Sequence, residues 1–193
     1  MIDRSIEAPG FSDPVFDAQS VFRTALTALS EPGRVLTLPS SLGIDAAPAL
    51  LLALADHDTP IWLDGTASKF AAYLRFHTGA EIVDDSTAAR FAMIGSGTLC
   101  PPLGRFEPGS PDYPDRSATL IVEVEALVEG GDWTLSGPGI PTSRTLSVGG
   151  LPTDFLSQWA DNHGSYPQGV DLFLTCGSQL AGLPRSTRVT PCM

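Results

Sequence analysis

The chain has 193 residues, which is enough for one domain with a well-buried core and too few for two domains of typical size. Its 22 acidic residues outnumber its 11 basic residues and give a net charge of −11, which excludes the basic footprint that nucleic-acid binding requires. Hydrophobic residues make up 42% of the chain, but no apolar run approaches the ~20 residues of a membrane span, so neither membrane nor nucleic acid is an expected partner.

The first predicted helix begins at Asp13-Pro14, where Asp is a good N-cap and Pro suits the first helical position, and it ends at Pro32-Gly33. Its apolar residues recur at intervals of three and four and predict one buried face, formed by Val15, Ala18, Phe22, Ala25, Leu26 and Leu29. A short strand at 35–38 and a buried helix at 49–55 follow. A turn at 56–60 then leads to a core strand at 61–63, an amphipathic helix at 67–76, and strands at 82–83 and 91–94.

A loop rich in proline and glycine is predicted at 95–117, and a loop of this length is expected to be functional, an interface or partly mobile. A long strand at 119–128 follows, then a hairpin turn at 129–132 and a strand at 133–136. A third helix at 153–160 precedes a closing hairpin, in which Cys-Gly-Ser-Gln (176–179) reverses the chain between two apolar strands. Gly-Ser-Gly (95–97) and Gly-Pro-Gly (137–139) are interpreted as turns rather than phosphate loops.

The order of these elements predicts a single α/β domain over residues 1–193, with a mixed sheet flanked by helices. Helices and strands alternate in the first half, whereas antiparallel hairpins dominate the second half. The N-terminal sequence MIDRSIEAPGF has neither a basic start nor a continuous apolar stretch, so no signal peptide is predicted and a cytoplasmic location is expected.

The basic residues and cysteines restrict the chemistry. Lys69 is the only lysine, and no Gly-rich string ends in Gly-Lys-Ser/Thr, which excludes a P-loop. A pyridoxal phosphate enzyme would have to form its Schiff base on Lys69, near the start of a predicted surface helix. Cys100, Cys176 and Cys192 make no metal-binding spacing, so no metal and no cofactor are expected. Cys176 is interpreted as a small buried side chain and Cys192 as exposed.

Four stretches of the chain, in order, resemble one family. They are FRTALTALSEPG (22–33), LLALADHDTPIWL (51–63), YLRFHTGAEIV (73–83) and the closing YPQGVDLFLTCGSQLAGLPRSTRV (166–189). With SATLIVEV and SGPGI added, the resemblance covers most of the chain from about residue 11 to residue 189. The chain resembles PhnH, the H subunit of the bacterial carbon–phosphorus lyase core complex.

The resemblance implies a fold like that of pyridoxal-phosphate-dependent transferases without the cofactor, a homodimer, and association with the other core subunits. It also implies an accessory role in the first stage of phosphonate breakdown, in which an alkylphosphonate displaces adenine from ATP to give α-D-ribose 1-methylphosphonate 5-triphosphate. A radical iron–sulfur subunit later breaks the carbon–phosphorus bond, and this chain lacks the clustered cysteines of that subunit.

Four residues are candidates for binding an anionic ligand such as ATP or a phosphonate. Arg75 and His77 end the second amphipathic helix, within a family-like stretch, where they either meet an anion or cap the helix. Arg185 lies just beyond the last predicted strand, where a guanidinium could grip a phosphate or pair with a carboxylate. Asp58 belongs to an Asp-His-Asp run that resembles a metal or acid–base cluster, although no further His or Cys lies at ligand spacing and turn formation also explains the run.

Three functions remain open at this point. The sequence has no complete set of acid, base and nucleophile, which favours an architectural subunit that dimerises and docks on other core subunits, with the 95–117 loop as one docking element. Alternatively, Arg75, His77 and Arg185 grip triphosphate or phosphonate and take part in catalysis. A stand-alone sugar-phosphate enzyme is the third reading. The negative net charge requires that any anion site be a local arginine cluster.

Overall fold

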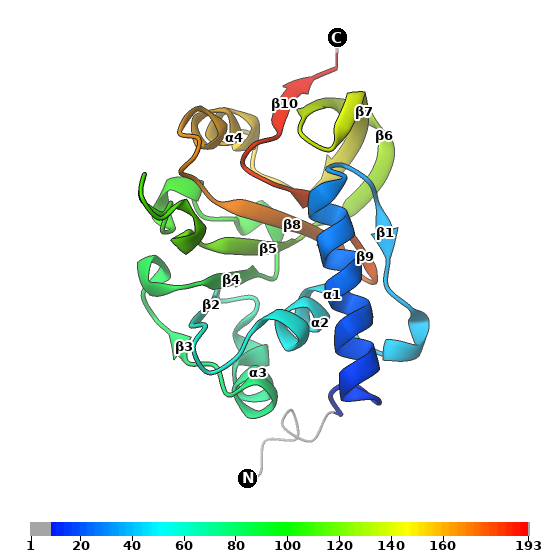
Figure 1. Cartoon of the computed structure of the whole chain (residues 1–193), viewed down its shortest axis with the longest axis vertical. Helices are drawn as coiled ribbons and strands as arrows, with labels where there is room; N and C mark the ends of the chain where they lie inside the picture. The colour runs from blue at the N-terminus through cyan, green and yellow to red at the C-terminus, as the bar shows by residue number, and fades with distance from the viewer. Residues whose placement is uncertain (1–8, 193) are drawn as a thin grey trace.

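Two β-sheets of different character organise residues 9–192, the part of the chain that the computed structural model describes (Figure 1). Over these residues the larger sheet has seven strands in the order β1-β9-β8-β5-β4-β2-β3, and the smaller has three in the order β10-β6-β7. Strands β2, β3, β4, β5 and β8 are parallel, β9 is antiparallel to both its neighbours, and the smaller sheet is antiparallel throughout.

The elements have the following bounds. The helices are α1 (Pro14–Ser30), α2 (Ala46–Leu54), α3 (Ala71–Thr78) and α4 (Phe155–Gly164). The strands of the larger sheet are β1 (Leu36–Thr37), β2 (Ile61–Leu63), β3 (Ile82–Val83), β4 (Phe91–Ile94), β5 (Thr119–Glu123), β8 (Asp171–Cys176) and β9 (Gln179–Leu183). Those of the smaller sheet are β6 (Ala126–Gly137), β7 (Ile140–Gly149) and β10 (Arg188–Pro191). The mixed sheet flanked by helices that the sequence predicts is therefore confirmed.

Both faces of the larger sheet are covered. Successive residues of a strand point to opposite faces, so Ile61 packs in the cluster beneath α1, α2 and α3, whereas Trp62 packs in the cluster on the other face. Ile121 and Leu120 divide in the same way along β5. The second cluster includes α4, the smaller sheet and the 95–117 loop, so one layer of strands supports two hydrophobic cores.

Helix α1 begins as predicted, because the Asp13 carboxylate accepts a hydrogen bond from the Phe16 amide (3.2 Å). The predicted buried face is wrong in part. The side of the helix that packs inward carries Val21, Ala25 and Ala28, of which only Ala25 belongs to the predicted face. The bulkier residues of the predicted face are exposed, namely Val15 (74%), Phe22 (50%) and Leu26 (57%). The buried residues and the exposed residues each recur at helical spacing, so the sequence does not show which set is buried. The close packing of α1 on β9 determines it.

Two predictions about the segment that forms the smaller sheet are wrong. The strand predicted at 119–128 is two strands, since the chain leaves the larger sheet after Glu123 and enters the smaller one at Ala126. Residues 129–132 are not a hairpin turn but an irregularity inside β6, where Gly130 (φ +91°) and Gly131 (φ +106°) shift the register against β7. The actual reversal is at Pro138-Gly139, and the following strand β7 was not predicted.

The remaining elements lie close to their predicted positions. Helix α2 begins three residues earlier than expected, the helix predicted at 67–76 starts as a 3₁₀ turn (Ser68–Phe70), and α4 is shifted toward the C-terminus. The 95–117 loop is packed rather than loose, because Leu103 and Phe106 are buried and the Leu103 amide donates to Gln158 Oε1 of α4 (2.9 Å). None of the helices in the described part of the chain is long and apolar enough to cross a membrane.

Candidate functional site

The carboxyl ends of the parallel strands β2, β4, β5 and β8 meet at one edge of the larger sheet. From β2 the chain crosses to β3 through α3 on one face, whereas from β4 it reaches β5 through the 95–117 loop on the other face. The two connections diverge between β2 and β4. In open α/β sheets, ligands bind outside the carboxyl ends of the strands at such a point, so a functional site is expected here.

Asp64, directly after β2, fixes the backbone at this edge. The residue is 8% exposed, and its carboxylate accepts hydrogen bonds from the Thr66 hydroxyl (2.7 Å), the Ala67 amide (2.7 Å) and the Gly95 amide (3.1 Å). Gly95 directly follows β4, so one carboxylate joins the ends of two neighbouring strands. Asp64 therefore organises the edge through hydrogen bonds that already use its oxygens.

Glu123, the last residue of β5, has a similar role toward the closing hairpin. It accepts hydrogen bonds from the Thr175 hydroxyl (2.6 Å) and from the Gly177 amide (2.9 Å). Gly177 lies in the reversal between β8 and β9, which confirms the turn predicted at 176–179. The most distinctive segment of the sequence is thus held against the same edge of the sheet.

A cleft made of two adjoining hollows opens at this edge. The inner hollow has a volume of about 110 Å³ and is lined by residues that include Thr66, Met93, Gly95 and Glu123. The outer hollow has a volume of about 670 Å³ and is lined by residues that include Leu42, Ile44 and Tyr73. Both are lined by Asp45, Pro48, Lys69 and Phe70, which therefore mark the junction between them.

Lys69 is the cationic residue of this cleft. Its Nζ lies 5.1 Å from the centroid of the Phe70 ring, within the range of a cation–π contact. Asp45, at the N-terminus of α2, and Glu123 supply carboxylates to the same lining. The cleft thus offers one ammonium group, two carboxylates and a mainly apolar outer wall.

Arg75 and His77, the predicted anion-binding pair, lie on the exposed side of α3. The His77 ring packs 4.6 Å from the Tyr73 ring and 5.0 Å from the Phe76 ring, measured between centroids. The helix continues two residues beyond the predicted end at 76 and is capped by Gly79, whose amide donates to the Arg75 carbonyl (3.1 Å). The two side chains do not line either hollow of the cleft.

Asp58 lies in the predicted turn, where its side chain is 82% exposed and its Oδ2 is 3.4 Å from His57 Nε2. The turn is held by its own residues, since Asp56 Oδ1 accepts from the Asp58 amide (3.0 Å) and from the Thr59 hydroxyl (3.1 Å). A Cβ atom placed on Gly79 would be 3.8 Å from His57 Cβ, so the turn lies beside the end of α3.

Arg185 is embedded in the protein, with 12% of its side chain exposed. Its guanidinium forms a two-pronged ion pair with Asp171, in which Nε donates to Oδ1 (3.0 Å) and Nη2 donates to Oδ2. The remaining donors reach the Ser117 hydroxyl and the carbonyls of Pro114 (2.8 Å) and Pro167 (3.4 Å). Arg185 therefore joins β8 to the end of the 95–117 loop and to the turn that precedes β8.

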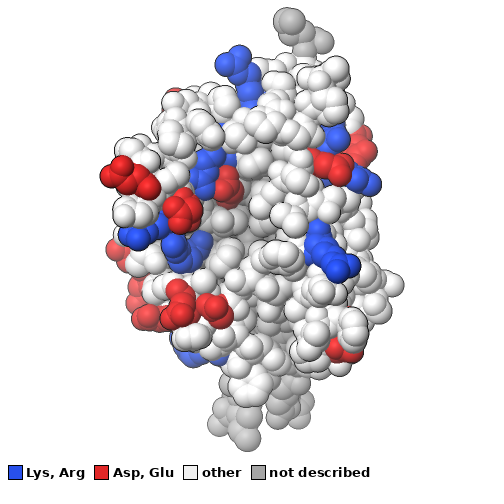
Figure 2. All heavy atoms as spheres, in the orientation of Figure 1, with Lys and Arg blue, Asp and Glu red and all other residues white. Residues whose placement is uncertain are grey.

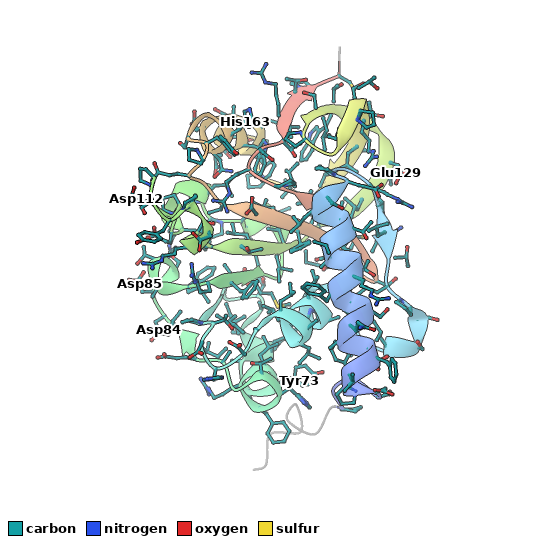
Figure 3. The ribbon with its side chains drawn as sticks, in the orientation of Figure 1. Tyr73, Asp84, Asp85, Asp112, Glu129 and His163 are labelled. Carbon is teal, nitrogen blue, oxygen red and sulfur yellow. The ribbon has the colours of Figure 1, made fainter. Side chains whose placement is uncertain are left out.

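The four predicted residues do not form one site. His163 Nδ1 donates to the Arg185 carbonyl (2.9 Å), and His163 lies near the upper end of the view in Figure 3. Tyr73, on the same helix as Arg75 and His77, lies near the lower end. Asp58 is close to the end of α3, but Arg185 is separated from all three.

The residues at the sheet edge were missed by the sequence analysis. Asp64 directly follows the strand predicted at 61–63, which is a signal that could have located the edge, whereas Glu123 lay inside the strand predicted at 119–128 and ends β5 only in the structure. Lys69 was noticed as the only lysine, but was considered only as a Schiff-base candidate on a surface helix.

The cysteines should differ in reactivity. Burial, helped by the negative charge of Asp64, raises the pKa of the Cys100 thiol to about 12, so this thiol stays protonated near neutral pH. Cys192 is exposed, as predicted, whereas Cys176 is half-buried and has a pKa raised by its burial and by Glu123. We expect a maleimide to label Cys192 but not Cys100 in the folded protein, and all three cysteines in denaturant, as read by peptide mass spectrometry. Equal labelling rates at Cys100 and Cys192 in the folded protein would contradict the burial.

Comparison with known proteins identifies the family. The family model described as "Bacterial phosphonate metabolism protein (PhnH)" matches residues 9–190. A Rhizobium meliloti (strain 1021) protein named "Alpha-D-ribose 1-methylphosphonate 5-triphosphate synthase subunit PhnH" is 42% identical over 192 residues, which cover 95% of this chain and 96% of the relative. A Stutzerimonas stutzeri protein named "Putative C-P lyase subunit protein HtxG" is 31% identical over 171 residues, covering 89% of this chain and 85% of the relative. The family resemblance that the sequence motifs indicate is thereby confirmed, and the chain belongs to the PhnH family.

Proposed function

We propose that this chain is a subunit of an α-D-ribose 1-methylphosphonate 5-triphosphate synthase, working in the cytoplasm with the other core subunits of a carbon–phosphorus lyase. The observation that carries the proposal is the 42% identity, over nearly the full length of both chains, to the R. meliloti protein of that name. The family match and the relative named as a putative C-P lyase subunit support the same role. In the proposed reaction an alkylphosphonate displaces adenine from ATP.

A complementation experiment tests this function. An R. meliloti strain that lacks its own PhnH is supplied with this chain, with the R. meliloti protein, or with an empty vector. We expect growth on methylphosphonate as sole phosphorus source with either protein and not with the vector. If the chain is expressed and folded but restores no growth while the R. meliloti protein does, the proposal fails.

Within the assembly we assign the chain an architectural role. The donors of Arg185 are committed to protein groups, and Asp58 lies in an exposed turn that its own residues hold. Direct participation in catalysis, with ATP or phosphonate as ligand, is the second candidate, and the exposure of Arg75 and His77 on one helix favours it.

The double substitution Arg75→Ala with His77→Ala distinguishes these two roles. Under the architectural role, we expect the variant to assemble with the other core subunits and to support adenine release from ATP and methylphosphonate at the wild-type rate. Both side chains are exposed, so the fold should be retained, which circular dichroism checks. A variant that assembles normally but releases no adenine would overturn the architectural role and support direct participation.

We further propose that the exposed face of α1 is the homodimer interface. Val15, Phe22 and Leu26 recur along one side of the helix and remain exposed. In Figure 2 the surface over α1 is mostly uncharged, apart from basic side-chain atoms over the middle of the helix. Exposed apolar patches of this kind mark protein–protein contacts. The 95–117 loop, from which Leu99 (64%) and Tyr113 (51%) project, is the corresponding candidate for contact with another core subunit.

Replacing Leu26 with glutamate tests the α1 interface. Because Leu26 is 57% exposed, the charge should leave the fold intact, but two copies of it would be buried in a dimer at high cost. We expect size-exclusion chromatography with light scattering to show a dimer for the wild type and a monomer for Leu26→Glu. Val128→Glu, at an equally exposed apolar position of β6, is the control and should remain dimeric. A dimer that survives Leu26→Glu would place the interface elsewhere.

The likeness to pyridoxal-phosphate-dependent transferases remains part of the proposal. It is supported by a seven-stranded, mostly parallel sheet with one antiparallel strand among the described residues, and by a ligand-sized cleft at the carboxyl ends of its strands.

A further inference from the structure

The outer hollow of the cleft is shaped by aromatic and apolar walls. Its volume of about 670 Å³ falls within the range of small-molecule sites, roughly 300–1,000 Å³. Phe70 and Tyr73 line it together with Leu42, Ile44 and Pro48. The Tyr73 hydroxyl donates to the Pro9 carbonyl (3.2 Å), which fixes the orientation of the phenol ring. Walls of this kind accept a planar, apolar ligand surface.

The inner end of the cleft offers hydrogen-bond acceptors. The Asp45 side chain is exposed, makes no capping hydrogen bond to α2, and lines both hollows. Glu123 also lines the inner hollow, where about 110 Å³ admits the edge of a sugar or an amino group. Its two carboxylate oxygens already accept from Thr175 and Gly177, and each can accept one further hydrogen bond. Carboxylates in such a position accept hydrogen bonds from ligand hydroxyl or amino groups.

The charges of the cleft select against phosphate groups, and its few carboxylates do not make a metal site. Two carboxylates and one ammonium leave the lining net negative, in a chain whose net charge is −11. Anions are therefore repelled both locally and at long range. Across residues 9–192, no group of three or more His, Cys, Asp or Glu side chains could hold a metal ion, so the carboxylates do not form a cation site. A suitable ligand therefore carries no negative charge, and has a flat heteroaromatic body and several hydrogen-bond donors.

We propose that this cleft binds a nucleoside without phosphate groups. The base lies in the outer hollow against Phe70 and Tyr73, and the ribose hydroxyls donate to Asp45 and Glu123 at the inner end. The isolated chain is expected to bind the nucleoside without any partner subunit. The connection of this binding to the adenine that the synthase releases rests on the proposed function.

The single lysine provides a direct probe of this site. Reductive ¹³C-methylation labels the Lys69 amine, which keeps its positive charge, and otherwise only the N-terminal amine. Titration with adenosine should shift the Lys69 signal in a saturable manner, whereas ATP should bind at least tenfold more weakly because of its phosphates. Free adenine, which lacks the ribose, should also bind more weakly than adenosine. Calorimetry on the unlabelled protein checks the affinities.

Three variants locate the binding. Phe70→Ala removes an aromatic wall and should weaken adenosine binding about tenfold, the usual scale of base–aromatic stacking. Asp45→Asn changes an exposed acceptor without changing its shape and should also weaken binding. Asp58→Asn, an exposed carboxylate outside the cleft, is the matched control and should bind as the wild type does. Because Asp45 makes no capping hydrogen bond, Asp45→Asn should fold even if Phe70→Ala does not.

The proposal is overturned by any of three results. These are no saturable Lys69 shift with adenosine, ATP binding as tight as that of adenosine, or unchanged binding in Asp45→Asn. None of them bears on the subunit assignment, which complementation of the R. meliloti strain tests independently. Loss of binding in a variant that still restores growth would separate the nucleoside site from the synthase reaction.

Discussion

Replacing Arg185 with leucine is expected to lower the free energy of unfolding by about 3–5 kcal/mol, the range found when one partner of a buried ion pair is removed. The guanidinium pairs with Asp171 and donates to Ser117, Pro114 and Pro167, and only 12% of the Arg185 side chain is exposed. Without it, the Asp171 carboxylate, 24% exposed, loses its counter-charge, and two segments of loop lose their common anchor.

Thermal unfolding measures this effect. A loss of that size corresponds to a fall in Tm of roughly 10 °C for a chain of this length. Arg188→Leu is the matched control, because Arg188 is three residues away, exposed, and should change Tm little. If Arg185→Leu proves as stable as Arg188→Leu, the guanidinium does not anchor the fold and a ligand role for Arg185 regains support.

Replacing Gly182 with alanine is expected to cost about 1–3 kcal/mol or more, the scale of overpacking in a well-packed core. A Cβ atom at Gly182 would lie 2.4 Å from the Ala28 carbonyl oxygen and 2.7 Å from the Leu29 amide nitrogen. These are backbone atoms that no side-chain rotation can move aside. Helix α1 would therefore have to move away from β9.

Two measurements on Gly182→Ala test this packing. Denaturant unfolding should show the loss of stability, and Gly104→Ala is the control, because nothing lies within 4 Å of the added Cβ there. Since the displacement also moves the face of α1 that we propose as the dimer interface, light scattering should show weaker association of Gly182→Ala if that proposal holds. Wild-type stability in Gly182→Ala would mean that α1 and β9 do not pack this closely.

The sequence predicts most individual elements of this fold, because capping and periodicity are local signals. Asp13-Pro14 marks the start of α1, and apolar runs mark β2, β4 and β8. Which stripe of α1 is buried could not be predicted in this way. Two apolar stripes compete along the helix, and the glycine that selects the smaller one, Gly182, lies far away in sequence.

The smaller sheet was harder to predict for a related reason. The chain leaves one sheet and enters the other between Glu123 and Ala126 with no proline or glycine to mark the change. Gly130-Gly131 resembles a hairpin turn, but β6 continues past it, because β7 pairs with β6 both before and after the two glycines and β10 pairs with the part that follows them. Pairing between strands is a non-local property, which periodicity does not report.

The candidate site depends on topology even more strongly. Lys69 and Glu123 are far apart in sequence and share no motif, and they line one hollow only because parallel strands end at the same edge. Arg75, Asp58 and Arg185 attracted attention through residue type and family-like context. Residue type alone could not show that the guanidinium of Arg185 donates its hydrogen bonds to other groups of the protein.

Adenine release in a reconstituted assembly tests the subunit assignment most directly. The other core subunits are combined with ATP and methylphosphonate, with or without this chain, and adenine is quantified while co-elution is checked. We predict release with the chain present and none when it is omitted. Equal release without it, or failure of the folded chain to co-elute with the other subunits, would contradict its assignment as a synthase subunit.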